Sequence, residues 1–368
     1  MNLRLALLPV HRWVGMTLGL VVLVSAITGA GMAFRNSLDP LVYPKQFHAG
    51  ACAAPLPMDS FVAAARSAHP AGAVDYLRIR GEADAPVAVR FTNKDTLYFD
   101  RCTAQLSASQ NRYEGVFGQL EQIHRMVFFH SGGWLMGAGA ISMLILMGGV
   151  GLYLWWPRKP RRFLQGFALD RRLKGRLFTL GLHRTLGVWA AVMLMISATT
   201  ALPNAFDGVK AAIMAWGAPA HETKPRSRGA KGTPRLPMQA AFATVTRLSP
   251  APREVLMHLA RRGSDPIEIY IIDANAPHAN ARTYLYLDAY SGRVLRFAPY
   301  ATSGWGSRLY YWMLSVHTGE VGGIFGQLLL FAGAASVPFL AYTGMSSYLR
   351  RRFTRKAVRQ TAEPRVAA

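Results

Sequence analysis

Four of the ten histidines occupy matched positions in a sequence that repeats itself. His11 and His183 each open an apolar block with the letters His-Arg-x-x-Gly. His124 and His317 each lie 27 residues before a glycine near the end of another apolar block. Facing imidazoles from two helices are what a six-coordinate haem requires as axial ligands. Because the chain has no Cys-x-x-Cys-His attachment motif, the expected cofactor is non-covalent haem b, two per chain.

His130 is a second candidate for the outer ligand on the second helix. It lies about 9 Å beyond His124 along a continuous helix, at 1.5 Å per residue, and on another face. Its matched position is Gly323, so no histidine of the other repeat faces it. His124, however, stands some ten residues before the apolar block, which keeps His130 as its substitute. The other five histidines are expected in solvent: His48, His69, His221, His258 and His278.

The alternative interpretation is that these histidines have a structural role and bind no metal. A single histidine beside an arginine at a membrane boundary is usually an interfacial residue with its polar tip among the headgroups. His11 and His183 both fit that description when each is taken alone. Their recurrence as a matched pair favours ligation.

Four apolar blocks must position these histidines, which lie at or just before the start of a block. The chain is 51% hydrophobic and 17% charged, below the roughly 25% charge of soluble domains. Each block has about 20 residues or more, enough to cross a bilayer. The blocks are Trp13–Phe34, Trp134–Trp156, His183–Pro203 and Ile324–Tyr348. A removable signal peptide is the alternative for the first block, but its apolar run is longer than the usual 7–15 residues.

The net charge is +23, and the placement of the basic residues predicts the orientation of the chain in the membrane. Residues 1–12, 157–184 and 349–368 together hold eighteen basic and two acidic residues. Basic residues crowded at helix ends and in short loops mark the cytoplasmic side. We therefore expect both termini in the cytoplasm, the chain in a membrane among lipid, and no nucleic-acid partner.

The two long loops between the blocks also match each other. Each contains Leu-Pro-Met, a helix-like stretch and short strands such as 74–80, 87–92, 267–273 and 283–288. The predicted fold is a membrane α-helical protein with four transmembrane helices in two parallel repeats, carrying two α+β periplasmic domains. Residues 218–232, basic and rich in Pro and Gly, are expected to form an exposed linker. The predicted segments are helix one at 1–34, outer domain one at 35–123, helix two at 124–157, a basic cytoplasmic loop at 158–182, helix three at 183–203, outer domain two at 204–312, helix four at 313–349 and a basic tail at 350–368.

Both cysteines, Cys52 and Cys102, lie in the first long loop. A disulfide between them is plausible if that loop is in an oxidising periplasm. The alternative is two unpaired thiols.

Several motifs in this order resemble the PepSY-associated transmembrane proteins of bacterial inner membranes. They are His11-Arg12 with Gly15, His124-Arg125, Gly151-Leu152-Tyr153-Leu154-Trp155-Trp156-Pro157-Arg158, and His317-Thr318-Gly319-Glu320. The stretch Asp288–Val294 is similar to the end of a PepSY domain, although the matching first-loop turn at Cys102–Ala104 lacks the usual glycine.

The resemblance implies a role in iron uptake, with some members being di-haem ferric-siderophore reductases. It implies that His11 and His183 hold a haem on the cytoplasmic side, and His124 and His317 a haem on the periplasmic side. The expected function is that of an oxidoreductase that passes electrons to a periplasmic ferric siderophore. No nucleotide fingerprint occurs, so a quinol or a separate cytoplasmic-side reductase must donate the electrons.

A haem-free membrane scaffold or sensor is the alternative function. Its PepSY-like domains would bind a periplasmic protein or peptide. The sequence identifies no catalytic residue for either function.

Overall fold

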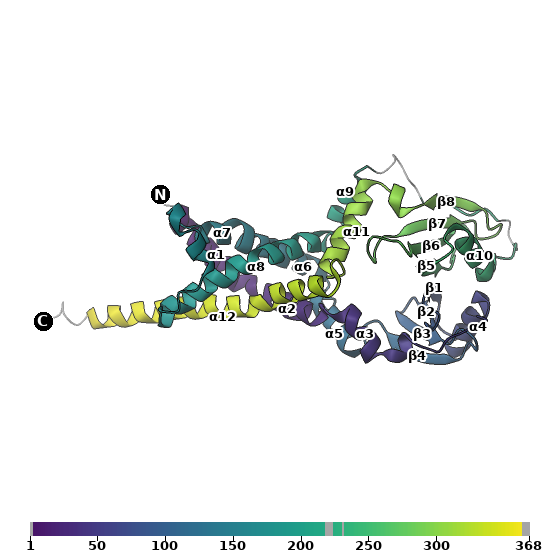
Figure 1. Cartoon of the computed structure of the whole chain (residues 1–368), viewed down its shortest axis with the longest axis horizontal. Coiled ribbons are helices and arrows are strands. Elements are labelled where there is room, and N and C mark those ends of the chain that lie inside the picture. Colours follow the sequence, from purple (N-terminus) through teal and green to yellow (C-terminus); the bar gives the residue numbers. More distant parts are fainter. Residues whose placement is uncertain (1–2, 218–223, 230–231, 363–368) are drawn as a thin grey trace. The chain divides into compact units, whose positions relative to one another are not determined.

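The computed structural model describes residues 3–217, 224–229 and 232–362. The chain divides into two compact units (Figure 1). The membrane unit comprises Met1–Ala33, Gln119–Lys210 and Val316–Ala368. The sheet unit comprises Phe34–Gly118 and Ala211–Ser315.

Three continuous spans and one bent pair of helices make up the membrane unit. The continuous spans are Gly132–Trp155, Gly175–Ala205 and Gly323–Thr354. The first consists of α6 (Gly132–Leu144), a π-helical turn (Ile145–Gly149) and α7 (Val150–Trp155), while α8 (Gly175–Ala205) and α12 (Gly323–Ala362) contain the other two. The described part of the chain thus holds three helices able to span a membrane, or four if the bent pair is one span.

The bent pair replaces the single helix expected at Trp13–Phe34. α1 (Leu3–Thr17) and α2 (Gly19–Met32) meet at an angle of 58°. The Thr17 hydroxyl donates to the carbonyl of Trp13 at 2.8 Å, and Gly19 follows the break. Back-bonded threonine and glycine are both recognised causes of helix bending.

Small residues let the helices of the membrane unit approach closely. α12 packs against α8 and α2, and α6 packs against the same two helices. A Cβ added at Gly333 would lie 2.9 Å from the Met193 side chain, and one at Gly139 would lie 3.1 Å from Val21. Such contacts drive helix association where apolar burial alone cannot, because lipid tails are themselves apolar.

Two short helices precede the second and fourth spans. α5 (Gly115–His124) and α11 (Trp305–His317) each end at one of the matched histidines. The remaining helical segments are α3 (Arg35–Val42), α9 (Asp207–Ala215), α4 (Met58–Ala68), α10 (Met238–Leu248) and the 3₁₀ turns Pro44–Gln46, Pro160–Arg162, Leu164–Phe167 and Tyr300–Thr302.

One continuous sheet unites both outer segments, where the sequence predicts two separate α+β domains. Its eight antiparallel strands run in the order β4-β3-β2-β1-β5-β6-β7-β8. The strands are β1 (Val74–Arg80), β2 (Val87–Phe91), β3 (Asp95–Phe99), β4 (Leu106–Asn111), β5 (Pro252–His258), β6 (Ile267–Asp273), β7 (Thr283–Leu287) and β8 (Val294–Ala298). β1 and β5 pair at the centre, from Tyr76 opposite His258 to Arg80 opposite Glu254. Pairing them removes two exposed edges.

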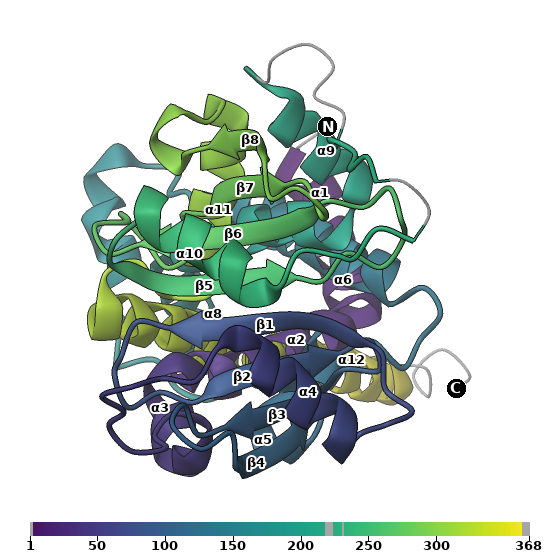
Figure 2. The ribbon, with the colours of Figure 1, turned by 90° about the vertical axis from the view of Figure 1, so that its right-hand side faces the viewer.

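Helices α4 and α10 cover one face of the sheet (Figure 2). They cap each other: Asp59 accepts the backbone N–H groups of Met238 and Gln239 at 2.9 and 3.0 Å, and Gln239 Oε1 accepts that of Met58 at 2.9 Å. A carboxylate at a helix N-terminus satisfies free N–H groups and favours the helix dipole. These bonds tie the two halves of the sheet unit together.

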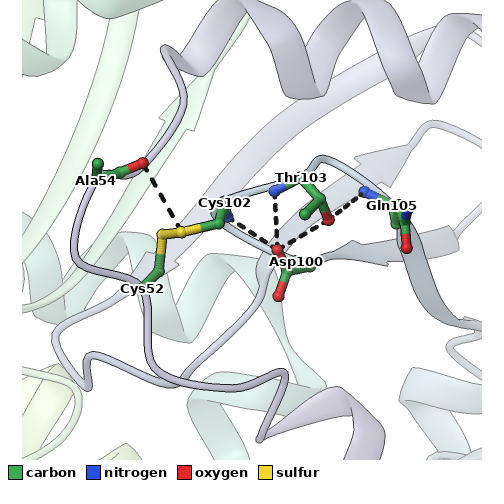
Figure 3. Close-up of a disulfide and its surroundings, with 6 residues drawn as sticks. All are labelled: Cys52, Ala54, Asp100, Cys102, Thr103 and Gln105. Carbon is green, nitrogen blue, oxygen red and sulfur yellow. Dashed lines mark hydrogen bonds between the residues drawn. A yellow bond between two sulfur atoms is a disulfide. The ribbon is translucent and has the colours of Figure 1, made fainter.

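Cys52 and Cys102 form a disulfide, with their Cα atoms 5.6 Å apart (Figure 3). Beside it, Asp100 Oδ1 accepts the backbone N–H groups of Cys102 and Thr103 at 2.9 and 2.8 Å. The disulfide therefore fixes the turn after β3 to the segment before α4.

Replacing both cysteines by serine should lower the free energy of unfolding of the sheet unit by about 3–4 kcal/mol. The physical reason is that the bond closes a chain separation of 50 residues and so restricts the unfolded ensemble. Urea unfolding of the full chain in detergent measures the loss. In the parent protein, thiol labelling after denaturation without reductant should find no reactive cysteine, and two reactive thiols would refute the pairing.

Candidate functional site

The matched histidines form two facing pairs within the membrane unit. His11 on α1 faces His183 on α8, with ring centroids 6.1 Å apart and ring planes at 85°. His124 and His317, the last residues of α5 and α11, face each other with centroids 6.3 Å apart and planes at 45°. All four rings are half-buried. Each pair joins equivalent positions of the sequence repeat.

Three of the four rings are held in the same way. In each, Nδ1 lies 2.9–3.2 Å from a backbone carbonyl and from the hydroxyl of the threonine three residues later. The partners are Ser25 and Thr28 for His124, Ser197 and Thr200 for His317, and Leu340 and Thr343 for His183. A carbonyl can only accept, so Nδ1 carries the proton. Nε2 is left as a free acceptor, the state in which a histidine binds metal.

His11 is the exception. Its Nδ1 is buried and has no hydrogen-bond partner in the part of the chain that the structure describes. The other member of its pair, His183, has both the carbonyl and the threonine.

Glycines give two of the rings their space. A Cβ added at Gly29 would lie 3.2 Å from Cε1 of His124, and one at Gly344 would lie 3.2 Å from Cε1 of His183. These distances are shorter than ordinary van der Waals contact, so a side chain at either position would press on the imidazole. Gly29 and Gly344 therefore help Thr28 and Thr343 to position the rings of His124 and His183.

The donor set limits what these pairs could bind. Over the described ranges, no group of three or more His, Cys, Asp or Glu side chains could hold a metal ion. Two imidazoles alone leave most of a metal's coordination positions to other ligands. A pair of this kind therefore suits a metal that is already held by an organic macrocycle.

Comparison with known protein families finds a match. The model of the PepSY-associated TM region family matches residues 8–351, which include all four histidines and the whole sheet. The chain belongs to this family. A search of curated proteins finds no match.

In this PepSY-associated TM region protein, His124 rather than His130 faces His317 at the end of α11. The chain leaves helix after His124, turns through Met126 at a φ of 50°, and begins α6 only at Gly132. His130 lies exposed in that turn. The expected spacing of about 9 Å along one helix does not apply, because the two histidines are not on one helix.

Of the five histidines expected in solvent, His278 is instead buried, with 6% of its surface exposed. Its Nδ1 accepts the Asn280 backbone N–H at 3.2 Å and contacts the Ser315 hydroxyl at 3.0 Å, while Nε2 lies 2.9 Å from the Tyr300 hydroxyl. Burial lowers the pKa of this imidazole. The sequence gives no signal for this network, because its members are far apart along the chain.

Three more of these histidines lie beside carboxylates on the sheet unit. His48 contacts Asp84, His69 contacts Asp95 and His258 contacts Asp75. His221 lies outside the described residues. The expected linker at 218–232 is described only at 224–229 and 232, and there it is not simply exposed: Ser227 is buried and its hydroxyl accepts the backbone N–H of Ala289.

Proposed function

We propose that this protein is a di-haem b oxidoreductase of the bacterial inner membrane that passes electrons outward to a periplasmic ferric siderophore. His11 and His183 would hold the inner haem, and His124 and His317 the outer one. The two facing pairs of imidazoles, three with Nδ1 committed to a carbonyl, carry the proposal. The basic short loops favour cytoplasmic termini, with the two repeats parallel across the membrane.

The spacing of each pair fits one iron between two rings. A metal–imidazole nitrogen bond is about 2 Å long, and adding the ring radii on both sides gives centroids about 6 Å apart. The centroid separations of 6.1 and 6.3 Å agree with this value. In three of the four rings the proton is on Nδ1, so Nε2 is the nitrogen available to bind iron.

The surrounding residues orient three of the four rings for ligation. The carbonyls of Ser25, Ser197 and Leu340 hold the proton on Nδ1 and so fix both the tautomer and the ring orientation. The adjacent glycines leave the ring edges uncovered by side chains. Haem, when bound, supplies one-electron transfer. Reduction of Fe(III) weakens the hold of hard oxygen ligands, which is how a siderophore would release its iron as Fe(II).

The absorption spectrum of the full-length protein tests the proposal. After expression with ample haem and purification in detergent, we expect a Soret band that shifts on reduction with dithionite. Pyridine haemochrome analysis should give about two haem b per chain, and the reduced protein should be reoxidised by a ferric siderophore. A colourless protein after reconstitution with haem would refute the reductase and support the scaffold or sensor.

A further inference from the structure

The inner histidine pair is chemically unequal, and the outer pair is not. His124 and His317 each have the carbonyl and the threonine hydroxyl at Nδ1, and so does His183. His11 has neither: its Nδ1 is buried without a partner among the described residues. One side of the inner pair is therefore held by two acceptors and the other side by none.

The sequence accounts for the missing threonine. The spacing of 27 residues from the preceding histidine to the glycine is the same in both repeats, so Thr343 and Val150 are equivalent. Valine has nearly the shape of threonine but offers no oxygen. The position before Gly151 therefore has no side-chain oxygen, whereas the position before Gly344 has one.

The backbone accounts for the missing carbonyl. Ile145–Gly149 is a π-helical turn, whereas the equivalent residues 338–342 lie within the regular helix α12. A Cβ added at Gly151 would lie 1.8 Å from the carbonyl oxygen of Leu146, five residues earlier, so only glycine fits this turn. π-turns rearrange the carbonyls of the helix that contains them. The equivalent of the Leu340 carbonyl is in this turn and does not receive the His11 proton.

The hydrogen bond at Nδ1 affects how strongly an imidazole donates to a metal. A ligand histidine that gives its N–H to an acceptor becomes more basic and stabilises the oxidised metal. His183 has this support and His11 lacks it. An iron shared by these two rings is less electron-rich than one held by two supported rings, and is easier to reduce.

We infer that Val150 and the π-turn Ile145–Gly149 raise the reduction potential of the His11–His183 haem by withholding a hydrogen-bond acceptor from His11. This inference rests on the proposed function, because it assigns haem to that pair. A haem held by His11 and His183 would be the first to accept the donated electron. A raised potential would favour that step without a change of either ligand.

Val150→Thr tests the inference by restoring an acceptor with little change of shape. Spectroelectrochemical titration of the purified full-length protein should show one of the two midpoint potentials lowered and the other unchanged. A tenfold change in the oxidised-to-reduced ratio corresponds to about 59 mV for one electron, and we expect a shift up to that size.

Thr343→Val and Thr200→Val are the matched controls. Thr343→Val removes the hydroxyl acceptor from His183, which keeps the Leu340 carbonyl, and should raise the potential that Val150→Thr lowers. Thr200→Val, next to His317, should raise the other potential only. If Val150→Thr binds two haems and leaves both potentials unchanged, the inference is refuted while the proposed function stands. If Val150→Thr does not fold, failure of Thr343→Val to raise one potential refutes it. If the parent binds no haem, the proposed function has failed, and the inference with it.

Discussion

His183→Ala should remove one of the two haems and leave about one per chain. His11→Ala should remove the same haem, because both residues serve one iron. His124→Ala and His317→Ala should each remove the other haem. Pyridine haemochrome analysis gives the stoichiometry, and the reduced spectra should be alike within each pair. Reduction of a ferric siderophore should fail in all four variants, since electrons must pass through both sites.

His130→Ala is the matched control, because this residue lies exposed in the turn after α5. It should keep both haems. If His130→Ala lost a haem and His124→Ala kept both, the assignment of His124 as the ligand opposite His317 would be wrong. The proposed electron transfer through two haems would stand. If one of these single substitutions removed both haems, the assignment of one haem to each histidine pair would be contradicted.

Asp288→Ala should destabilise the sheet unit by roughly 3–5 kcal/mol, as expected when a buried, fully bonded carboxylate is removed. Asp288 is 5% exposed, and its Oδ1 accepts the N–H of Tyr290 and both the N–H and hydroxyl of Ser291 at 2.9–3.0 Å. Its Oδ2 accepts the N–H of Arg228 at 2.9 Å. The variant leaves all four donors without their acceptor. Urea unfolding of the full chain in detergent measures the loss.

The Asp288 carboxylate also predicts that the stability of the sheet unit depends on pH. Burial acts to raise the pKa of Asp288, but hydrogen bonds from Ser291, Arg228 and Tyr290 outweigh it and lower the pKa to about 2. Because the folded pKa lies below the ordinary value, this contribution to stability is complete above about pH 4 and is lost as the pH falls towards 2.

Asp100→Ala is the comparison for that variant, since Asp100 occupies the matching turn of the first half. Within the described residues, only its Oδ1 accepts hydrogen bonds, from Cys102 and Thr103, and the disulfide also holds that turn. We expect a smaller loss of stability than in Asp288→Ala. Equal losses of unfolding free energy in Asp100→Ala and Asp288→Ala would contradict this expectation.

The facing of His11 with His183 and of His124 with His317 could be predicted because the duplication supplies an internal comparison. A lone histidine at a membrane boundary carries little information, but His11 and His183 recur in the same motif. The apolar blocks likewise predict three of the spans closely, because bilayer thickness sets a minimum length that few other segments reach.

Features that depend on local backbone breaks could not be predicted. The bend between α1 and α2 and the turn that separates His124 from α6 interrupt stretches whose composition suits a continuous helix. The pairing of β1 with β5 could not be predicted from the sequence, for another reason. Strand patterns show which face is buried but not which strand lies next to which.

The pairing of β1 with β5 makes each half of the sheet unit the partner of the other. A chain that held only one repeat would end its four-stranded sheet at an open edge and leave the N-terminus of its helix without a cap. A second identical chain could supply both. Within this single chain, each half of the sheet unit therefore takes the place that a second subunit would take in a dimer.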